Sequence, residues 1–218
     1  MNYTVIYADR KTVSIQLGRD GSLTVRAPRG MSRREINEIV SSHQSWIDKK
    51  RAEQKPAAPL DFIYLLGAKY PVAETSSNRA GFDGASFYLP AGLDDAEKRA
   101  AIAGYFKLAG KEKMADKLSR WAKIMNLPAP PPPKITSAKT RWGSCGGKGG
   151  NHISFSFVLL MTDEECIDAV TVHELAHIRY KNHNKDFYAL VRSYIPDYDE
   201  REKKLKEYGR MISAQGFM

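Results

Sequence analysis

The sequence predicts an α+β protein, with short strands at its beginning and amphipathic helices through most of its second half. Three observations lead to this fold class. Residues 3–26 contain three β-branched segments that are separated by turn residues. Two later segments, 33–54 and about 95–125, carry apolar residues at helical spacing. The chain has 218 residues, of which 42% are hydrophobic, so it can bury a core without disulfide bonds.

The N-terminal segment is expected to form a small sheet followed by one helix. The strands are predicted at residues 3–7, 12–17 and 22–26. Asp20-Gly21 is a typical hairpin turn between the last two. Ser32 and Glu35 have the spacing of a capping box, which starts the helix predicted over 33–54. Because His43 lies on the apolar stripe of that helix, we expect a packed core histidine there and not a metal ligand.

Prolines separate the following elements. After the break at 55–59, strands are predicted near 62–74 and 85–89. Asp94 or Asp95 can cap a long helix that keeps its apolar spacing to Met125. The segment Pro128–Pro133 has five prolines in six residues, which predicts a stiff extended connector.

The last third of the chain predicts one strand and three helices. The strand is expected at 153–158, and Thr162–Glu165 has the pattern of a second capping box. The helices are expected from there to about Tyr180, around 184–194 and around 197–208, ending at Gly209. We therefore divide the chain into an N-terminal β-rich region, 1–93, and a second region, 94–218, which could also form one continuous compact unit.

The formal net charge of +9 is spread along the chain. Residues 1–56 carry +5, and residues 57–127 and 128–218 carry +2 each. The most basic window, 98–123, is interpreted as a solvated helix surface; a nucleic-acid partner is the alternative, but no nucleic-acid-binding motif accompanies the charge. We see no secretory signal and no membrane-spanning segment. Two cysteines, Cys145 and Cys166, are expected to be small buried residues, and the expected compartment is the cytoplasm.

Three of the five histidines lie between positions 173 and 183. The sequence His173-Glu174-Leu175-Ala176-His177 has the H-E-x-x-H pattern of zinc-dependent peptidases. On a helix, His173 and His177 lie one turn apart on the same face and can bind one Zn²⁺. Glu174 projects beside the ion and can accept a proton from a water that the metal activates. The alternative is a helix with two surface histidines in ordinary contact.

A catalytic zinc site needs a third protein ligand. We favour His183, because a turn through Lys181-Asn182 can bring it back toward the ion. The alternatives are carboxylates further along the chain: Asp186, Asp197 and Glu200. His152, at the start of the strand, is expected to be structural or near the cleft.

The reaction that follows is hydrolysis of a peptide or protein substrate, with Glu174 as general base and one Zn²⁺ as the cofactor. Another donor should stabilise the oxyanion, and the candidates are Tyr180, Tyr188, Tyr194 and Arg141. An extended substrate could add as a strand to the sheet edge near 151–158.

These residues resemble a known family. Lys139–Cys145 (Lys-Thr-Arg-Trp-Gly-Ser-Cys), the H-E-x-x-H segment and Asn182–Tyr188 together are similar to the YgjP-like metallopeptidases, zincin-fold proteins related to the WLM and SprT-like groups. The resemblance implies a zincin-like fold, with the H-E-x-x-H helix packed on a small mixed sheet beside an N-terminal hairpin and helix region. It also implies that His173, His177 and His183 hold zinc, that Glu174 is catalytic, and that Arg141–Ser144 (Arg-Trp-Gly-Ser) belongs to the strand region that flanks the cleft.

Other interpretations differ in class. Metzincins carry glycine three residues after the second histidine, where this chain has Tyr180, which argues against that class. The kinship with SprT-like proteins and the positive charge leave open a DNA-associated protease or a nucleic-acid-linked zinc-binding protein. A purely structural zinc domain is the third hypothesis, but it would have no need for Glu174.

Overall fold

The computed structural model describes residues 2–18, 22–53, 58–147 and 151–218. The chain forms two compact units, residues 1–57 and 58–218, which we call the N-terminal and C-terminal units. The boundary expected after residue 93 therefore falls inside the C-terminal unit, because Ile63 and Phe87 belong to the same core as the long helix that follows them. None of the helices in the described part of the chain has the length and hydrophobicity that a bilayer-spanning helix requires.

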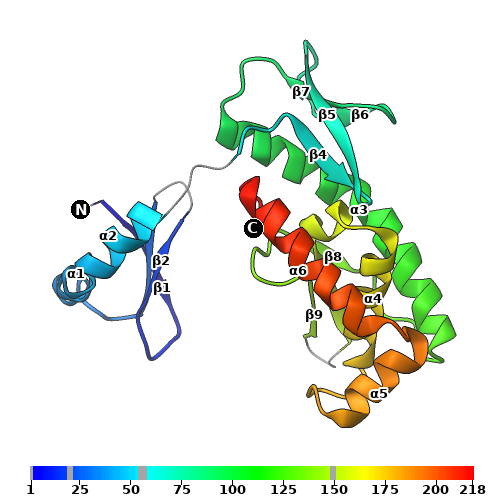
Figure 1. Ribbon diagram of the computed structural model, residues 1–218. Helices are drawn as coiled ribbons and strands as arrows, with labels where there is room; N and C mark the ends of the chain where they lie inside the picture. Colours follow the sequence, from blue (N-terminus) through cyan, green and yellow to red (C-terminus); the bar gives the residue numbers. More distant parts are fainter. Residues whose placement is uncertain (1, 19–21, 54–57, 148–150) are drawn as a thin grey trace. The chain divides into compact units, whose positions relative to one another are not determined.

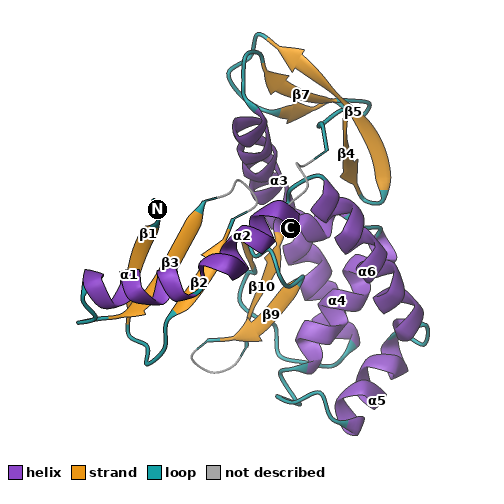
Figure 2. Cartoon of the chain, turned by 60° about the vertical axis from the view of Figure 1, so that its left-hand side comes forward, coloured by secondary structure: helices purple, strands orange, loops and turns teal. Residues whose placement is uncertain are grey.

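The N-terminal unit is a three-stranded sheet with two helices (Figure 2). Its strands are β1 (Thr4–Ala8), β2 (Ser14–Leu17) and β3 (Leu23–Pro28), in the order β1-β3-β2. β3 pairs parallel with β1 and antiparallel with β2. Val25 of β3 and Ile36 and Ile47 of the helices are fully buried between the two layers. The turn expected at Asp20-Gly21 lies outside the described residues.

The single helix expected over 33–54 is wrong, because two helices, α1 (Arg33–Ser42) and α2 (Gln44–Glu53), meet at His43. The capping box of Ser32 and Glu35 at the start of α1 is confirmed. At its end, the Ser42 hydroxyl donates to the carbonyl of Ile39, and Nδ1 of His43 lies 2.9 Å from the same oxygen. Such bonds compete with the helical pattern. The expectation of a core histidine is also wrong, because His43 is exposed.

The C-terminal unit begins with a four-stranded sheet. Its strands are β4 (Phe62–Leu65), β5 (Ala68–Thr75), β6 (Gly81–Phe82) and β7 (Phe87–Pro90), in the order β4-β5-β7-β6. The one strand expected near 62–74 is in fact a hairpin. Leu66 and Gly67 turn the chain with φ of 51° and 83°, a backbone that the Leu-Gly pair did not signal. Gly67 also lies against Asp163 and Tyr208, where a Cβ would come within 3.0 Å of Asp163 Cβ.

The long helix expected after Asp94 is present as α3 (Asp95–Ile124), capped by Asp94 and Glu97. Figure 1 shows it running from the four-stranded sheet along the rest of the unit. Gly104 and Gly110 do not break it, and at Gly110 a Cβ would come within 2.3 Å of Leu160. Several cations of the basic window are paired: Lys98 with Glu74, Arg99 with Asp95, Lys113 with Glu164, and Lys117 with Glu164 and Asp168. Part of this positive charge is therefore balanced by acidic neighbours.

A second sheet follows the proline segment. It contains β8 (Lys134–Thr136), β9 (Gly143–Gly146) and β10 (His152–Ser156), in the order β8-β10-β9. β10 is parallel to β8 and antiparallel to β9, with Phe155 opposite Gly143. The strand expected over 153–158 ends at Ser156, because residues 157–161 form a fully buried 3₁₀ helix. Residues 157–161 are all apolar, so their pattern has neither the two-residue period of a strand nor the 3.6-residue period of a helix.

Three helices complete the unit: α4 (Glu164–Ala176), α5 (Lys185–Tyr194) and α6 (Tyr198–Ala214). α4 lies beside α6 in Figures 1 and 2 and also packs against α3 and β9. The capping box expected at Thr162 is wrong. Asp163 caps α4 by accepting from the Cys166 amide, while the buried Thr162 hydroxyl donates to the Leu159 carbonyl. The expected end of the last helix at Gly209 is also wrong, because α6 continues to Ala214. Gly209 lies inside the helix, where Trp142 packs close to it.

The α+β class predicted from the sequence is confirmed. In the C-terminal unit, α4 packs against α3, α6 and β9, and its Val172, Leu175 and Ala176 are fully buried. The hydrophobic faces that α4 presents to the core fix the direction in which its polar residues point.

Candidate metal centre and active site

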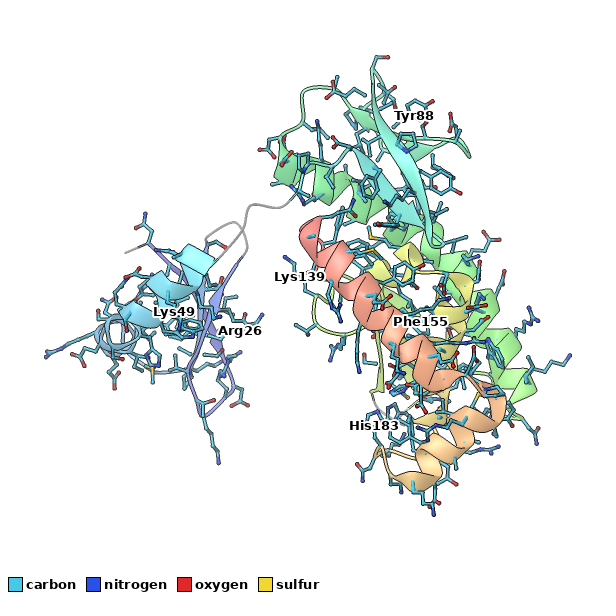
Figure 3. The ribbon with its side chains drawn as sticks, in the orientation of Figure 1. Arg26, Lys49, Tyr88, Lys139, Phe155 and His183 are labelled. Atoms are coloured by element: carbon cyan, nitrogen blue, oxygen red, sulfur yellow. The ribbon has the colours of Figure 1, made fainter. Side chains whose placement is uncertain are left out.

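α4 carries the H-E-x-x-H segment at its C-terminal end. His173 and Glu174 lie in its last turn, and His177 is its C-cap residue. The chain then turns, with the amides of Arg179 and Tyr180 donating to the carbonyl of Ala176. His183 follows in the segment between α4 and α5, where Figure 3 labels it. This turn places a residue ten positions after His173 next to the helix.

The structure brings His173, His177 and His183 together. One ring nitrogen from each lies within 4.8 Å of the others, so the three imidazoles could hold a metal ion. The Nε2 atoms of His173 and His183 are 3.0 Å apart. The turn after α4, which includes residues 181–182, therefore brings His183 back to the two helical histidines, as expected.

The other ring nitrogens of the helical pair have partners of their own. Nδ1 of His173 lies 2.7 Å from the hydroxyl of Tyr198, and Nδ1 of His177 lies 3.0 Å from the carbonyl oxygen of Tyr180. A carbonyl can only accept, so His177 must carry its proton on Nδ1. Its Nε2 lone pair is then available, as metal coordination requires.

Phe187 supports all three imidazoles from α5. The centroid of its fully buried ring lies 4.9, 4.6 and 4.7 Å from those of His173, His177 and His183. Asn184 caps α5 by accepting from the Phe187 amide at 2.9 Å, which fixes where the helix begins. The three imidazoles therefore pack against an apolar side chain. Burial and the neighbouring imidazoles lower the pKa of His173 to about 3, so this ring stays neutral and able to coordinate.

Glu174 is buried beside the cluster, with only 6% of its surface exposed. Burial raises the pKa of its carboxyl to about 7, against a smaller lowering by Arg141. On its other side lies Gly143 of β9, where a Cβ would come within 2.7 Å of Glu174 Oε1. A carboxyl held this way can take up or release a proton near neutral pH.

The burial of Glu174 predicts a pH-dependent cost in the metal-free chain. A carboxyl whose pKa is raised from 4.5 to about 7 in the folded state favours folding at low pH and costs stability as the pH rises through that range. Glu174→Gln removes the cost. The free energy of unfolding of the variant, relative to wild type, should increase by about 2.5 kcal/mol between pH 5 and pH 8.

Urea unfolding in the presence of a chelator measures this difference. Glu200→Gln is the matched control, because it removes a carboxyl of α6 that is exposed. A constant difference between Glu174→Gln and wild type across the range would contradict the shifted pKa.

The alternative third ligands lie elsewhere. Asp197 forms an ion pair with Arg201 at 2.9 Å, and Asp186 and Glu200 are exposed. His152 is exposed at the start of β10. Among the described residues, none of these belongs to a cluster of three or more groups that could bind a metal. Cys166 is buried as expected, but Cys145 on β9 is only partly buried.

The sheet edge that faces the site is not the expected one. β10 is the central strand of its sheet, so residues 151–158 offer no edge to a substrate. The edge strand is β9, which packs against α4 and includes Gly143 beside Glu174. The family resemblance implied a strand region at residues 141–144, but β9 has no strand signature of its own, because it is a four-residue segment with two glycines.

A cavity of about 220 Å³ opens between β9, α4 and α6. Its lining includes Trp142, Glu174, Tyr198, Glu202 and Leu205. Trp142 packs against the core and also lines this cavity. The cavity places a space for a substrate group directly beside the buried carboxyl.

A comparison with protein families identifies the chain's relatives. The model of the YgjP-like metallopeptidase domain matches residues 11–208. The chain belongs to the YgjP-like metallopeptidase family. No curated protein and no solved structure matches it significantly. The match spans most of the N-terminal unit as well as the histidine cluster, so the YgjP-like domain includes both units of the chain.

Three residues of this YgjP-like site escaped the sequence analysis: Phe187, Tyr198 and Glu202. Tyr198 and Glu202 lie on α6, more than twenty residues after His173, and no motif spacing connects them to it. For Phe187 a signal existed, since it is the first large apolar residue after the Asn184 cap and had to be buried near His183.

Proposed function

We propose that the chain is a zinc-dependent peptidase in which His173, His177 and His183 hold one Zn²⁺ and Glu174 is the general base. The observation that carries the proposal is the cluster of three imidazoles beside a buried carboxyl in a metallopeptidase family. Three neutral nitrogen donors suit zinc, and a catalytic site uses three protein ligands with one position left open. When bound, Zn²⁺ would lower the pKa of a water toward about 7 and polarise the substrate carbonyl.

The residues of the chain supply the proton transfers. Glu174 takes the proton from the attacking water and then gives it to the leaving amine. Its carboxyl is suited to both steps, because its pKa of about 7 in the metal-free chain lies near neutral pH.

Two of the four candidates for oxyanion stabilisation, Arg141 and Tyr188, lie beside residues of the proposed site. Arg141 lines the cavity with Glu174, and the Tyr188 ring is 6.0 Å from that of His183. Tyr180 is bound through its carbonyl to His177. We place the substrate as an extended strand along β9, because main-chain pairing there would lay a peptide bond across Glu174.

A denatured, fluorescently labelled protein tests the proposed activity. The chain should cleave it, lose the activity on treatment with a chelator and regain it with one equivalent of Zn²⁺. Cleavage that persists in the chelator would contradict a metal-dependent reaction.

The close approach of β9 to Glu174 makes Gly143 a sensitive position. In Gly143→Ala, the new Cβ would lie 2.7 Å from Oε1 and 2.8 Å from Cγ of Glu174, so the carboxyl must move. Because a shift of about 1 Å can cost on the order of 10²-fold in rate, we expect kcat/KM to fall by about 10- to 100-fold with zinc content unchanged.

Gly146→Ala is the matched control on the same strand, because a Cβ there meets nothing within 4 Å. Steady-state kinetics of the two variants should separate them clearly. Equal activities would mean that β9 does not constrain Glu174.

A further inference from the structure

Tyr198 and Glu202 form a hydrogen-bonded chain that ends on a histidine of the cluster. Tyr198 is the first residue of α6 and only 3% exposed. Its hydroxyl lies 2.7 Å from Nδ1 of His173 and 3.2 Å from Oε1 of Glu202, one helical turn further on. The two α6 side chains also line the cavity beside Glu174.

The chemistry of the three groups sets the direction of both hydrogen bonds. An ionised carboxylate can only accept, so the Tyr198 hydroxyl gives its one proton to Glu202. The same oxygen then offers a lone pair to His173, and Nδ1 of His173 must carry a proton to fill it. The ring is thereby held in the tautomer whose Nε2 has a free lone pair.

The neighbouring histidine agrees with this assignment. Nε2 of His173 lies 3.0 Å from Nε2 of His183, a distance at which one nitrogen donates and the other accepts. With the proton of His173 on Nδ1, His183 is the donor. The Nε2 lone pair of His173 therefore points into the cluster even without a metal.

We propose that Tyr198 and Glu202 are positioning residues: Glu202 orients the Tyr198 hydroxyl, which holds His173 in its Nδ1–H tautomer and so raises its affinity for the metal. This inference rests on the metal site proposed above. Without Glu202, the hydroxyl is free to turn and donate to Nδ1, which favours a proton on Nε2 and blocks coordination. Outer partners of metal-bound histidines commonly change metal affinity by about 10- to 100-fold.

A merely structural role for Tyr198 makes different predictions. Tyr198→Phe keeps the buried ring and removes only the hydroxyl, and Glu202→Ala leaves Tyr198 intact. Tyr208→Phe is the matched control, because Tyr208 is also on α6 and also donates to a carboxylate, Asp163, at 3.3 Å, away from the cluster. All three lose one hydroxyl–carboxylate hydrogen bond.

The first arm uses the metal-free chain with ¹⁵N-labelled histidine. Long-range ¹H–¹⁵N spectra should show His173 with its proton on Nδ1 in wild type and Tyr208→Phe. In Tyr198→Phe and Glu202→Ala the proton should shift toward Nε2. A wild-type His173 that carries its proton on Nε2 would overturn the proposal.

The second arm measures the zinc dissociation constant by competition with a chromophoric chelator. We expect an increase of about 10- to 100-fold in Tyr198→Phe and a smaller one in Glu202→Ala. The double variant should match Tyr198→Phe within about twofold, because Glu202 acts through the hydroxyl. Additive losses, or constants equal to that of Tyr208→Phe, would overturn it.

The two arms separate this inference from the proposed function. If wild type fails to bind zinc, the proposed function fails. The tautomer spectra still test whether the hydrogen-bonded chain of Tyr198 and Glu202 positions His173. If wild type binds zinc and Tyr198→Phe binds it equally well, only the positioning role of Tyr198 and Glu202 is refuted. Should Tyr198→Phe fail to fold, Glu202→Ala provides both measurements on its own, because Glu202 is the partly exposed end of the hydrogen-bonded chain.

Discussion

Glu174→Gln should lower kcat/KM for a denatured protein substrate by about 10²- to 10⁴-fold, with zinc content equal to that of wild type. Glutamine fills the same buried space beside Gly143 but cannot accept the proton of the attacking water. The three imidazoles are untouched, so binding and hydrolysis should separate cleanly. Steady-state kinetics and metal analysis of the same preparation measure both.

Glu200→Gln provides the control, because this exposed carboxylate of α6 has no place in the site. It should retain full activity. If Glu174→Gln kept wild-type activity, general-base catalysis by Glu174 would be refuted. If it lost zinc, the carboxyl would have a role in metal binding that the geometry does not predict.

His183→Ala should weaken zinc binding by more than about 100-fold, beyond the effect of losing an outer partner, because it removes one of three ligands. The helical pair His173 and His177 would remain. His183 is exposed and lies outside α4 and α5, so the variant should fold with the stability of the metal-free wild type. Chelator competition and thermal unfolding measure the two quantities.

His152→Ala is the matched control, an exposed histidine at the start of β10. It should bind zinc like wild type. Full zinc retention in His183→Ala would show that another residue supplies the third ligand, and the acidic residues near α5 would then need testing in turn.

The sequence predicted the part of the site that depends on local periodicity. His173, Glu174 and His177 share one helix, and a rotation of about 100° per residue was enough to place them. His183 was harder, because its position depends on a turn. The sequence indicated only that a turn through Lys181-Asn182 can bring it back toward the helix, and the structure brings His183 into the cluster.

The residues around the cluster could not be predicted, because long-range packing places them. The hydroxyl of Tyr198 reaches His173 only because α6 packs beside α4. The edge strand β9 could be expected only from the family resemblance, because it is defined by its pairing with β10 and its glycines carry no strand preference. The predicted helix cap at Thr162 failed because its hydroxyl donates to the carbonyl of Leu159, and Asp163 caps α4 in its place.

X-ray absorption at the zinc edge, on the chain loaded with one equivalent of Zn²⁺, tests the central claim most directly. We predict a shell of nitrogen and oxygen at about 2.0–2.1 Å, with scattering from three imidazoles in wild type and two in His183→Ala. A sulfur neighbour at about 2.3 Å, which would indicate ligation by Cys145 or Cys166, or fewer than three imidazoles in wild type, would contradict the three-histidine zinc site.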